Sequence, residues 1–296
     1  MATTAGLILC GGKSSRMGYD KASLRIGPRS LLELALERLG EVAQPIVLSL
    51  AAGAAPPSLP SGVLAVSDGR PEQGPLWGLL EGFRALEGKA EQVLVMPVDM
   101  PFFTPPWMHR LVDGLAGQMA CLFQWEGFTN ALTAAYRLEL LPKLESLVAE
   151  GRMRPLFISE GEPARVIAVE DHWREGDGPP PLMDMDTPEA YRQALLLEGI
   201  GNREGVPVTV EILLPPGPGS LGLSAMPPLP LFAATGEEAL AWVWRLYPEL
   251  QARYGEAGEG VALIAIGQDG GARPLSGRLR LSEGEHLRLD LSASQS

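Results

Sequence analysis

The first residues that could do chemistry are cations among glycines in residues 9–21, LCGGKSSRMGYDK. Glycines that follow an apolar run let the backbone approach a ligand, because no Cβ stands in the way. Their amides can bond to a phosphate or to a base edge, and Arg16 and Lys21 can form charge-assisted bonds with phosphate oxygens. The spacing matches neither a Walker P-loop nor a Rossmann GxGxxG motif. The segment predicts a phosphate-binding loop of another kind, and a solvated basic surface is the alternative.

Asp99 is the acidic residue whose position points most directly to a metal. It ends the apolar strand predicted at Gln92–Val98, and Pro97 and Pro101 stiffen the chain around it. Open α/β sheets bind their ligands at the carboxyl ends of the strands. A carboxylate at that edge suits Mg²⁺, which takes oxygen ligands and shares them with substrate phosphates. A structural cap is the alternative role for this side chain.

The bulk composition limits the classes of function. The chain has 296 residues, of which 46% are hydrophobic and 20% charged, as in a soluble globular protein. Its net charge of −12 argues against a nucleic-acid partner, although residues 1–30 hold five cations and one acid, Asp20. No apolar run reaches the ~18–20 residues that span a bilayer. Three scattered histidines argue against a Cys/His metal site, and the two cysteines, Cys10 and Cys121, fit a reducing cytoplasm.

Short apolar strands alternate with helix-patterned segments in the first two-thirds of the chain. The strands read as covered on both faces, and they are predicted at Ala5–Leu9, Pro45–Leu50, Val63–Ser67, Gln92–Val98, Met119–Gln124, Ala131–Tyr136 and Arg165–Val169. Helices with one apolar face are predicted around Leu32–Val42, Leu76–Leu86, Leu138–Glu150 and Thr187–Leu197. This order predicts a three-layer α/β domain over residues 1–200, with a mostly parallel, Rossmann-like nucleotide-binding sheet.

A second, smaller domain is predicted after a glycine-rich linker at residues 201–206. A strand at Pro207–Leu214 and a Pro/Gly-rich loop at Pro215–Pro230 come first. Thr235 and Glu238 then form a candidate capping box for a helix whose apolar side carries Leu240, Val243, Tyr247 and Leu250. Strands at Val261–Ile266 and Glu285–Leu291, with a turn at Gln268–Gly271, complete an α+β domain over residues 207–296.

The opening segment resembles the signature LAGGxSxRMGxDK of the MobA-type nucleotidyltransferases, the molybdenum cofactor guanylyltransferases. Three further stretches resemble the family's D…GPLAG, CDMPF and NxNTPE motifs in order and spacing: Asp68–Gly78, Pro97–Phe102 and Met183–Glu189. The resemblance covers about residues 4–197. It implies an enzyme that transfers GMP from GTP to the phosphate of molybdopterin and releases pyrophosphate.

The resemblance also implies a nucleotide site. The backbone of Leu9, Cys10 and Gly11 would read the base, and the triphosphate would lie against Gly12, Arg16 and Lys21. Asp68 would touch the guanine or ribose side, with a helix N-cap as its alternative role.

The same resemblance implies a catalytic and metal site. Arg16, Lys21 and Asp99 would carry catalysis, and Mg²⁺ would bind Asp99 with Asp184 as a second ligand or in the outer shell. Where the family more often has asparagines, this chain has Asp184 and Asp186, which add negative charge near the metal. Asp186 could instead serve as that ligand or as a helix N-cap. A phosphate monoester is ionised at pH 7, so no general base is expected.

Details of the motifs favour GTP over CTP. Gly11 and the segment Gly74-Pro75-Leu76 follow the guanylyl pattern, whereas related CTP-dependent enzymes read LAAG. Three departures are Ser49 in place of asparagine, Trp77 in place of a small residue, and Asn130-Ala131 in place of Gln/His-Pro. A cytidylyl- or sugar-1-phosphate nucleotidyltransferase therefore stays open, as does a catalytically weakened scaffold protein of the same pathway.

The C-terminal region resembles the small subunit of molybdopterin synthase, a ubiquitin-like β-grasp sulfur carrier. The resemblance rests on residue pattern at Glu237–Leu240, Tyr247–Leu250, Val261–Ile266 and Glu283–Leu287. That carrier works through a C-terminal Gly-Gly, and this sequence ends Ser294-Gln295-Ser296. The resemblance therefore implies a docking or structural module, one that could recruit another protein of the molybdopterin pathway, rather than sulfur chemistry.

Overall fold

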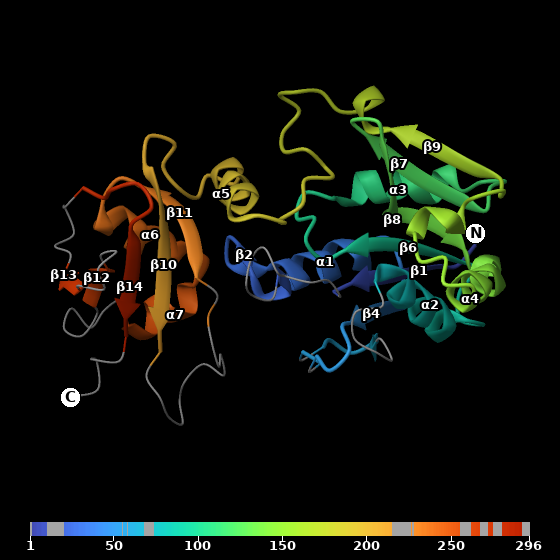
Figure 1. The fold of residues 1–296 in the computed structure, drawn as a ribbon, viewed down its shortest axis with the longest axis horizontal. Coiled ribbons are helices and arrows are strands. Elements are labelled where there is room, and N and C mark those ends of the chain that lie inside the picture. The colour runs from blue at the N-terminus through green and yellow to red at the C-terminus, as the bar shows by residue number, and fades with distance from the viewer. Residues whose placement is uncertain are drawn as a thin grey trace. The chain divides into compact units, whose positions relative to one another are not determined.

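The chain forms two compact units in the computed structural model (Figure 1). The structure describes residues 2–10, 21–54, 56–57, 59–67, 74–214, 226, 228–254, 262–266, 272–274 and 280–291. The first unit spans Met1–Ser14 and Leu31–Asp184, and the second spans Ser15–Ser30 and Met185–Ser296. The predicted linker at residues 201–206 stays a prediction, and the compact units divide the chain earlier, after Asp184.

A seven-stranded, mostly parallel sheet forms the centre of the first unit. Its spatial order is β5-β4-β1-β6-β8-β7-β9, and β8 alone among these strands runs antiparallel to its neighbours. The strands are β1 (Thr4–Leu9), β4 (Ile46–Leu50), β5 (Val63–Ser67), β6 (Gln92–Pro97), β7 (Ala120–Trp125), β8 (Phe128–Arg137) and β9 (Ala164–Ala168). The predicted mostly parallel α/β sheet is confirmed, because each predicted strand of this region exists.

Helices cover both faces of this sheet. A Cβ added to Gly6 of β1 would lie 2.6 Å from Leu39 of α1, whereas its neighbour Leu7 fills the space beside Gly82 of α2. Successive residues of a strand point to opposite faces, so α1 and α2 lie on opposite sides of β1. Helix α3 packs with α1, and α4 packs with α2. The helices are α1 (Leu31–Gly40), α2 (Pro75–Leu86), α3 (Pro105–Gly114) and α4 (Leu141–Ala149).

Three sequence-based expectations for this unit were incomplete or wrong. β5 is half-buried to exposed rather than covered on both faces, because it is the edge strand of the sheet. Helix α3 was missed, although its start at Pro105-Pro106 fits the preference of proline for the first helical turn. The helix predicted from Leu138 begins instead as a 3₁₀ turn, Leu138–Leu140, before α4.

The second unit contains a five-stranded mixed sheet in the order β11-β10-β14-β12-β13. The neighbours β10 and β14 are parallel, and the other pairs are antiparallel. A short hairpin, β2 (Arg25–Ile26) with β3 (Arg29–Ser30), belongs to the same unit. Its remaining elements are α5 (Pro188–Leu197), β10 (Val206–Leu213), β11 (Leu229–Ala233), α6 (Gly236–Leu246), α7 (Pro248–Tyr254), β12 (Ala262–Ile266), β13 (Ala272–Pro274) and β14 (His286–Asp290).

The loop and helix predicted for this unit need correction. The loop predicted to Pro230 ends earlier, because Leu229 begins strand β11. The helix predicted to run past Tyr247 breaks there (φ −130°, ψ 70°), since a residue before proline disfavours the helical region. The turn predicted at Gln268–Gly271 lies outside the described residues. Across the described part of the chain, no helix combines the length and apolarity needed to cross a membrane.

The predicted capping box at the start of α6 is confirmed in part. The Thr235 hydroxyl accepts from the Glu238 amide at 3.2 Å, as expected for an N-cap. The Glu238 carboxylate accepts from the amide of Ala234 at 2.8 Å, one residue before the cap. The hydrogen bond predicted for the Thr235 side chain is therefore confirmed. The Glu238 side chain instead accepts from a backbone amide just outside the helix.

Candidate active site

The carboxyl ends of β1, β4 and β6 form one edge of the first sheet. The Cys10 amide donates to the Ser49 carbonyl at 2.8 Å, and the Val98 amide donates to the Leu9 carbonyl at 3.0 Å. These bonds place the predicted residues Leu9 and Cys10 beside the start of the loop that carries Asp99. The predicted residues Gly11, Gly12, Arg16 and Asp68 lie outside the described residues.

Buried neighbours fix the loop around Asp99. Val98, Met100 and Phe103 are buried, while Asp99 between them is half-buried. The Thr133 hydroxyl of β8 donates to the Met100 sulfur at 3.2 Å. Because the flanking side chains are anchored in the core, Asp99 is held at the sheet edge as the sequence predicted.

The start of helix α2 lies over the same edge. Gly74 precedes it with φ 79°, a conformation that favours glycine. Gly78 packs so closely on β1 and β4 that a Cβ there would lie 2.7 Å from Ser49 Oγ and 3.4 Å from the Leu9 side chain. The absence of a side chain at Gly78 therefore lets the first turns of α2 approach Ser49, which is buried.

A pocket of about 470 Å³ opens next to the Asp99 loop. Met100 lines it, and so does Asp184, the predicted second metal ligand. The remaining lining residues are Trp125, Glu126, Phe128, Thr129, Asn130, Ala131, Leu132, Arg154, Pro155, Leu156 and Leu182. The pocket joins apolar and aromatic walls to a few polar groups, as small-molecule sites do.

An irregularity in β8 shapes one wall of this pocket. Phe123 of β7 pairs with Asn130 whereas Leu122 pairs with Ala134, so the residues between them leave the ladder. The Asn130 Oδ1 accepts from the amides of Leu132 and Thr133 at 2.9 and 3.0 Å. Asn130, which the sequence marked only as a departure from the family pattern, thus satisfies backbone groups that the bulge exposes.

The hairpin tip between β7 and β8 forms the pocket's outer lip. Glu126 has φ 48°, a left-handed conformation uncommon for residues other than glycine. Its amide donates to the Glu170 carboxylate at 2.5 Å, and this bond lowers the pKa of Glu170. Trp125 packs on Trp173 with ring centroids 5.2 Å apart. The neighbouring Phe128 is 79% exposed, which leaves an aromatic ring available at the lip.

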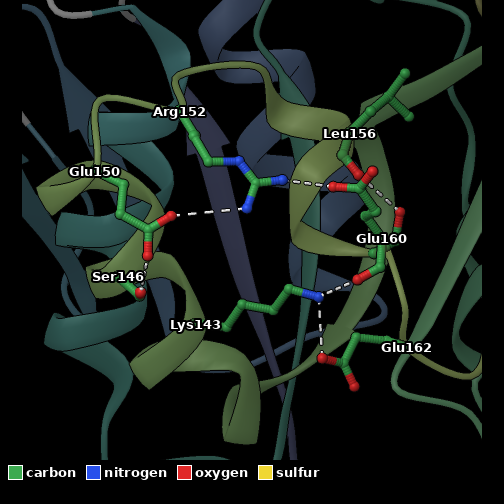
Figure 2. A network of polar contacts seen from close by, with 8 residues as sticks. Lys143, Ser146, Glu150, Arg152, Leu156, Glu160 and Glu162 are labelled. Carbon is green, nitrogen blue, oxygen red and sulfur yellow. Dashed lines mark hydrogen bonds and ion pairs between the residues drawn. The ribbon is translucent and has the colours of Figure 1, made fainter.

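Arg154 is a polar pocket residue that the sequence analysis missed. It lies over the Phe157 ring at 5.9 Å, and Arg152 lies over the same ring at 4.6 Å. Figure 2 shows the polar network that holds this segment against α4. Its bonds are Arg152 to Glu160 (2.6 Å), Arg152 to Glu150 (3.7 Å), Ser146 to Glu150 (2.7 Å), Lys143 to Glu162 (3.0 Å) and Lys143 to the Glu160 carbonyl. The only signal in the sequence is the basic run Arg152-Met153-Arg154.

Lys21 and Asp186 are described in the second unit, where they form an ion pair with each other. Lys21 is mostly buried, with 18% of its side chain exposed. The alternative role of Asp186 as a helix N-cap is wrong. Thr187 caps α5 instead, because its hydroxyl accepts from the Ala190 amide at 3.1 Å.

The oxygen donors at the sheet edge are compatible with a magnesium ion that substrate helps to hold. Among the described residues, no group of three or more His, Cys, Asp or Glu side chains could hold a metal alone. Mg²⁺ is usually bound by one or two carboxylates together with substrate phosphates. Asp99 lies half-buried on its loop at the sheet edge, and Asp184 lines the pocket next to that loop.

Comparison with known proteins decides the family. The family model for the MobA-like NTP transferase domain matches residues 6–166, more than half of the chain. The chain belongs to the MobA-like NTP transferase family. A protein of Mycobacterium bovis named "Probable molybdenum cofactor guanylyltransferase" is 33% identical over 175 residues, which is 56% of this chain and 84% of the relative. A protein of Mycobacterium ulcerans with the same name is 32% identical over 171 residues.

Solved structures agree with this family at the level of the fold. Molybdopterin-guanine dinucleotide biosynthesis protein A from Archaeoglobus fulgidus has a TM-score of 0.52 and 18% identity, over 65% of this chain and 97% of that one. The Mycobacterium tuberculosis protein Rv0371c has a TM-score of 0.50 and 22% identity, over 66% and 99%. The MobA-like range includes residues 21–30, which pack in the second unit.

Proposed function

We propose that this MobA-like protein transfers GMP from GTP to the phosphate of molybdopterin. The observation that carries the proposal is the shared sheet edge, where Leu9 and Cys10 lie beside the Asp99 loop and the pocket begins at Met100. The names of its mycobacterial relatives supply the acceptor and the nucleotide. The alternative reading as a weakened scaffold is less consistent with the presence of Arg16, Lys21 and Asp99.

The proposed reaction is an in-line displacement at the α-phosphorus of GTP. An oxygen of the acceptor's phosphate monoester forms the new bond to phosphorus, the bond from the α-phosphorus to the bridging oxygen breaks, and pyrophosphate leaves. The attacking oxygen is already ionised, so no proton has to be removed. Lys21 and Arg16 stabilise the charge on the phosphoryl oxygens as pyrophosphate departs.

Asp99 and Asp184 are the residues proposed to hold Mg²⁺. When bound, the ion neutralises charge on the triphosphate and orients it. Two carboxylates are enough because the triphosphate supplies further oxygen ligands. Leu9, Cys10 and Gly11 are proposed to read the base through their backbone, with Gly12 at the triphosphate and Asp68 on the guanine or ribose side.

The pocket beside Asp99 is proposed to bind the acceptor. The exposed Phe128 ring and Trp125 offer flat apolar surfaces to a planar heterocycle. Arg154 supplies a guanidinium suited to a phosphate, because it presents several donors in a fixed plane. The acceptor's phosphate would then lie near the Asp99 loop.

The C-terminal part is proposed to be a β-grasp module of the ubiquitin-like kind. Its strand order and its parallel central pair β10 and β14 support this, as does helix α6 between the second and third strands. We propose that it has a structural role and docks another protein of the molybdopterin pathway. Cytoplasmic location is the setting expected for such a protein.

The test is pyrophosphate release by the full chain with GTP or CTP and with or without molybdopterin, at fixed Mg²⁺. The proposal expects release with GTP that depends on molybdopterin, and release at least tenfold slower with CTP. If the protein prefers CTP, the proposed nucleotide is wrong and the enzyme is a cytidylyltransferase. If it turns over a sugar-1-phosphate in place of molybdopterin, the proposed acceptor is wrong. No turnover with any triphosphate would refute the proposed activity and favour the scaffold alternative.

A further inference from the structure

The segment that carries Lys21 is packed inside the second unit. It consists of a 3₁₀ turn at Lys21–Ser23, closed by a bond from the Leu24 amide to the Lys21 carbonyl at 3.0 Å, and of the hairpin β2–β3. Leu24 and Ile26 are buried. The segment is therefore packed in a defined position within the second unit. It lies in the MobA-like range of the sequence, whereas most of that unit lies outside the range.

Arg25 connects this segment to the end of α6 and the start of α7. Its guanidinium donates to the Leu246 carbonyl at 3.1 Å and pairs with the Glu249 carboxylate at 2.8 and 3.2 Å. It also lies over the Tyr247 ring, 4.7 Å from the centroid. Only 18% of the Arg25 side chain is exposed. A planar guanidinium that is paired twice and stacked on a ring cannot be replaced by a simple point charge.

The junction between α6 and α7 is built to receive this cation. Pro248 ends α6 at Leu246, and the last carbonyls of a helix lack partners within the helix. A cation near that end is favoured by the helix dipole. Glu249, in the first turn of α7, adds a full negative charge. The break that the sequence analysis did not predict is thus what creates the Arg25 site.

Two more contacts fix the segment on α5. The buried Tyr191 hydroxyl donates to the Arg25 carbonyl at 2.6 Å. Asp186, one residue before the Thr187 cap of α5, pairs with the Lys21 ammonium. Backbone and side chains at Arg25, and the side chain at Lys21, are therefore held by residues that follow Asp184 in the sequence.

We infer that Arg25 is a positioning residue for Lys21, because its contacts with Leu246, Tyr247 and Glu249 fix the turn that begins at Lys21. The inference rests on the proposed function, in which Lys21 binds the triphosphate. Arg25 acts through the turn that closes on Lys21 and not by touching the nucleotide. Residues of the C-terminal part then help to position Lys21, in addition to any docking role.

The first experiment measures the position of Lys21 without any nucleotide. Pulse acylation of the full chain with acetic anhydride, read by peptide mass spectrometry, reports how accessible the Lys21 amine is. Arg25→Ala should raise the acylation rate of Lys21 several-fold, and the milder Glu249→Gln should raise it in the same direction. Arg288→Ala is the matched control, because it breaks the Arg288–Glu211 pair on the sheet of the same unit.

The second experiment measures the dissociation constant of Mg-GTP for the same variants. A coupling of ordinary size predicts affinity weakened by about tenfold in Arg25→Ala, and no change in Arg288→Ala. In a Lys21→Ala background, Arg25→Ala should add little, because both substitutions remove the same contact. If Arg25 has only a structural role, Arg25→Ala lowers the melting temperature, and the losses of GTP affinity caused by the two substitutions are additive.

The outcomes separate the two proposals. Faster acylation of Lys21 together with non-additive losses of GTP affinity supports the inference. Unchanged acylation in both Arg25→Ala and Glu249→Gln, or fully additive losses, overturns it. If the wild type binds neither GTP nor CTP while Lys21 acylation still rises, the proposed function fails and the positioning of Lys21 by Arg25 stands.

Discussion

Lys21 is the side chain on which the proposed chemistry depends most. Its substitution by alanine should lower kcat for guanylyl transfer by roughly 10²–10³, the usual scale for one preorganised electrostatic donor. The reason is that charge on the departing pyrophosphate would lose its partner. Steady-state rates with GTP measure the effect, with Lys89→Ala, an exposed lysine in the turn after α2, as the control. A variant that keeps more than half of the wild-type rate would exclude Lys21 from this role.

Asp99 should behave as a metal ligand rather than as a structural cap. Asp99→Asn keeps the size of the side chain and removes its charge, so we expect kcat to fall by about a hundredfold or more and the Mg²⁺ concentration for half-maximal rate to rise. Asp113→Asn, on the exposed side of α3, should change neither quantity. An unaltered Mg²⁺ dependence in Asp99→Asn would point back to the cap.

The two cysteines should differ sharply in reactivity. Cys121 is fully buried, and burial raises the pKa of its thiol to about 11, so it stays protonated and inaccessible at pH 8. Cys10 is half-buried at the sheet edge. Iodoacetamide at pH 8 should modify Cys10 and spare Cys121, and Mg-GTP should slow the reaction of Cys10. Equal labelling in the folded protein would contradict this, and urea-unfolded protein, in which both thiols react, is the control.

At the scale of elements, close packing of glycine against strand β1 positions helix α2. A Cβ on Gly82 would lie 2.5 Å from the Leu7 side chain. Gly82→Ala should therefore lower the free energy of unfolding by about 1–3 kcal/mol through overpacking, as measured by urea denaturation.

Gly40→Ala is the matched control for this prediction. Its nearest neighbour would be at 3.6 Å, an ordinary contact, and alanine is the better helix former. We expect this variant to be as stable as the wild type or more stable. A Gly82→Ala variant with wild-type stability would mean that Leu7 shifts without cost.

The regular elements were predictable where residue pattern alone determines them. The apolar runs of β1, β4 and β6 and the apolar face of α2 are local features, and they appear where they were predicted. The walls of the pocket were not predictable. The β8 bulge at Asn130 and the position of Arg154 depend on the packing of other elements. Helix α3 was overlooked, although the prolines at its start are a helix signal.

At the scale of the whole molecule, sequence similarity and structure divide the chain differently. The motifs of the opening segment identified the family and the sheet edge. They did not indicate that residues 21–30 pack with elements after Asp184. The pairing of Arg25 with Glu249 joins residues 224 positions apart, and no local pattern reports such a contact.

We therefore expect nucleotide binding to stabilise part of the second unit. We expect Mg-GTP to slow amide hydrogen exchange at Leu246–Leu250, because binding at Lys21 stabilises the segment that Arg25 ties to this junction. Hydrogen exchange with mass spectrometry measures it, and the strands β10 and β14 around Glu211 and Arg288 serve as the internal reference. Slowing restricted to the first unit would argue against the coupling.

The order of synthesis gives the Arg25 contacts a further consequence. Arg25 precedes Leu246 by 221 residues and Glu249 by 224. At a translation rate of about 5–20 residues per second, these partners are synthesised roughly 10–45 s after Arg25. A nascent chain stalled before Leu246 contains all of residues 6–166, and Arg25 can donate to the Pro28 carbonyl, but it lacks the Leu246 carbonyl and the Glu249 carboxylate. On the inferred positioning of Lys21 by Arg25, translation past the end of α6 completes the contacts of this segment, and we expect shorter chains to bind Mg-GTP less tightly.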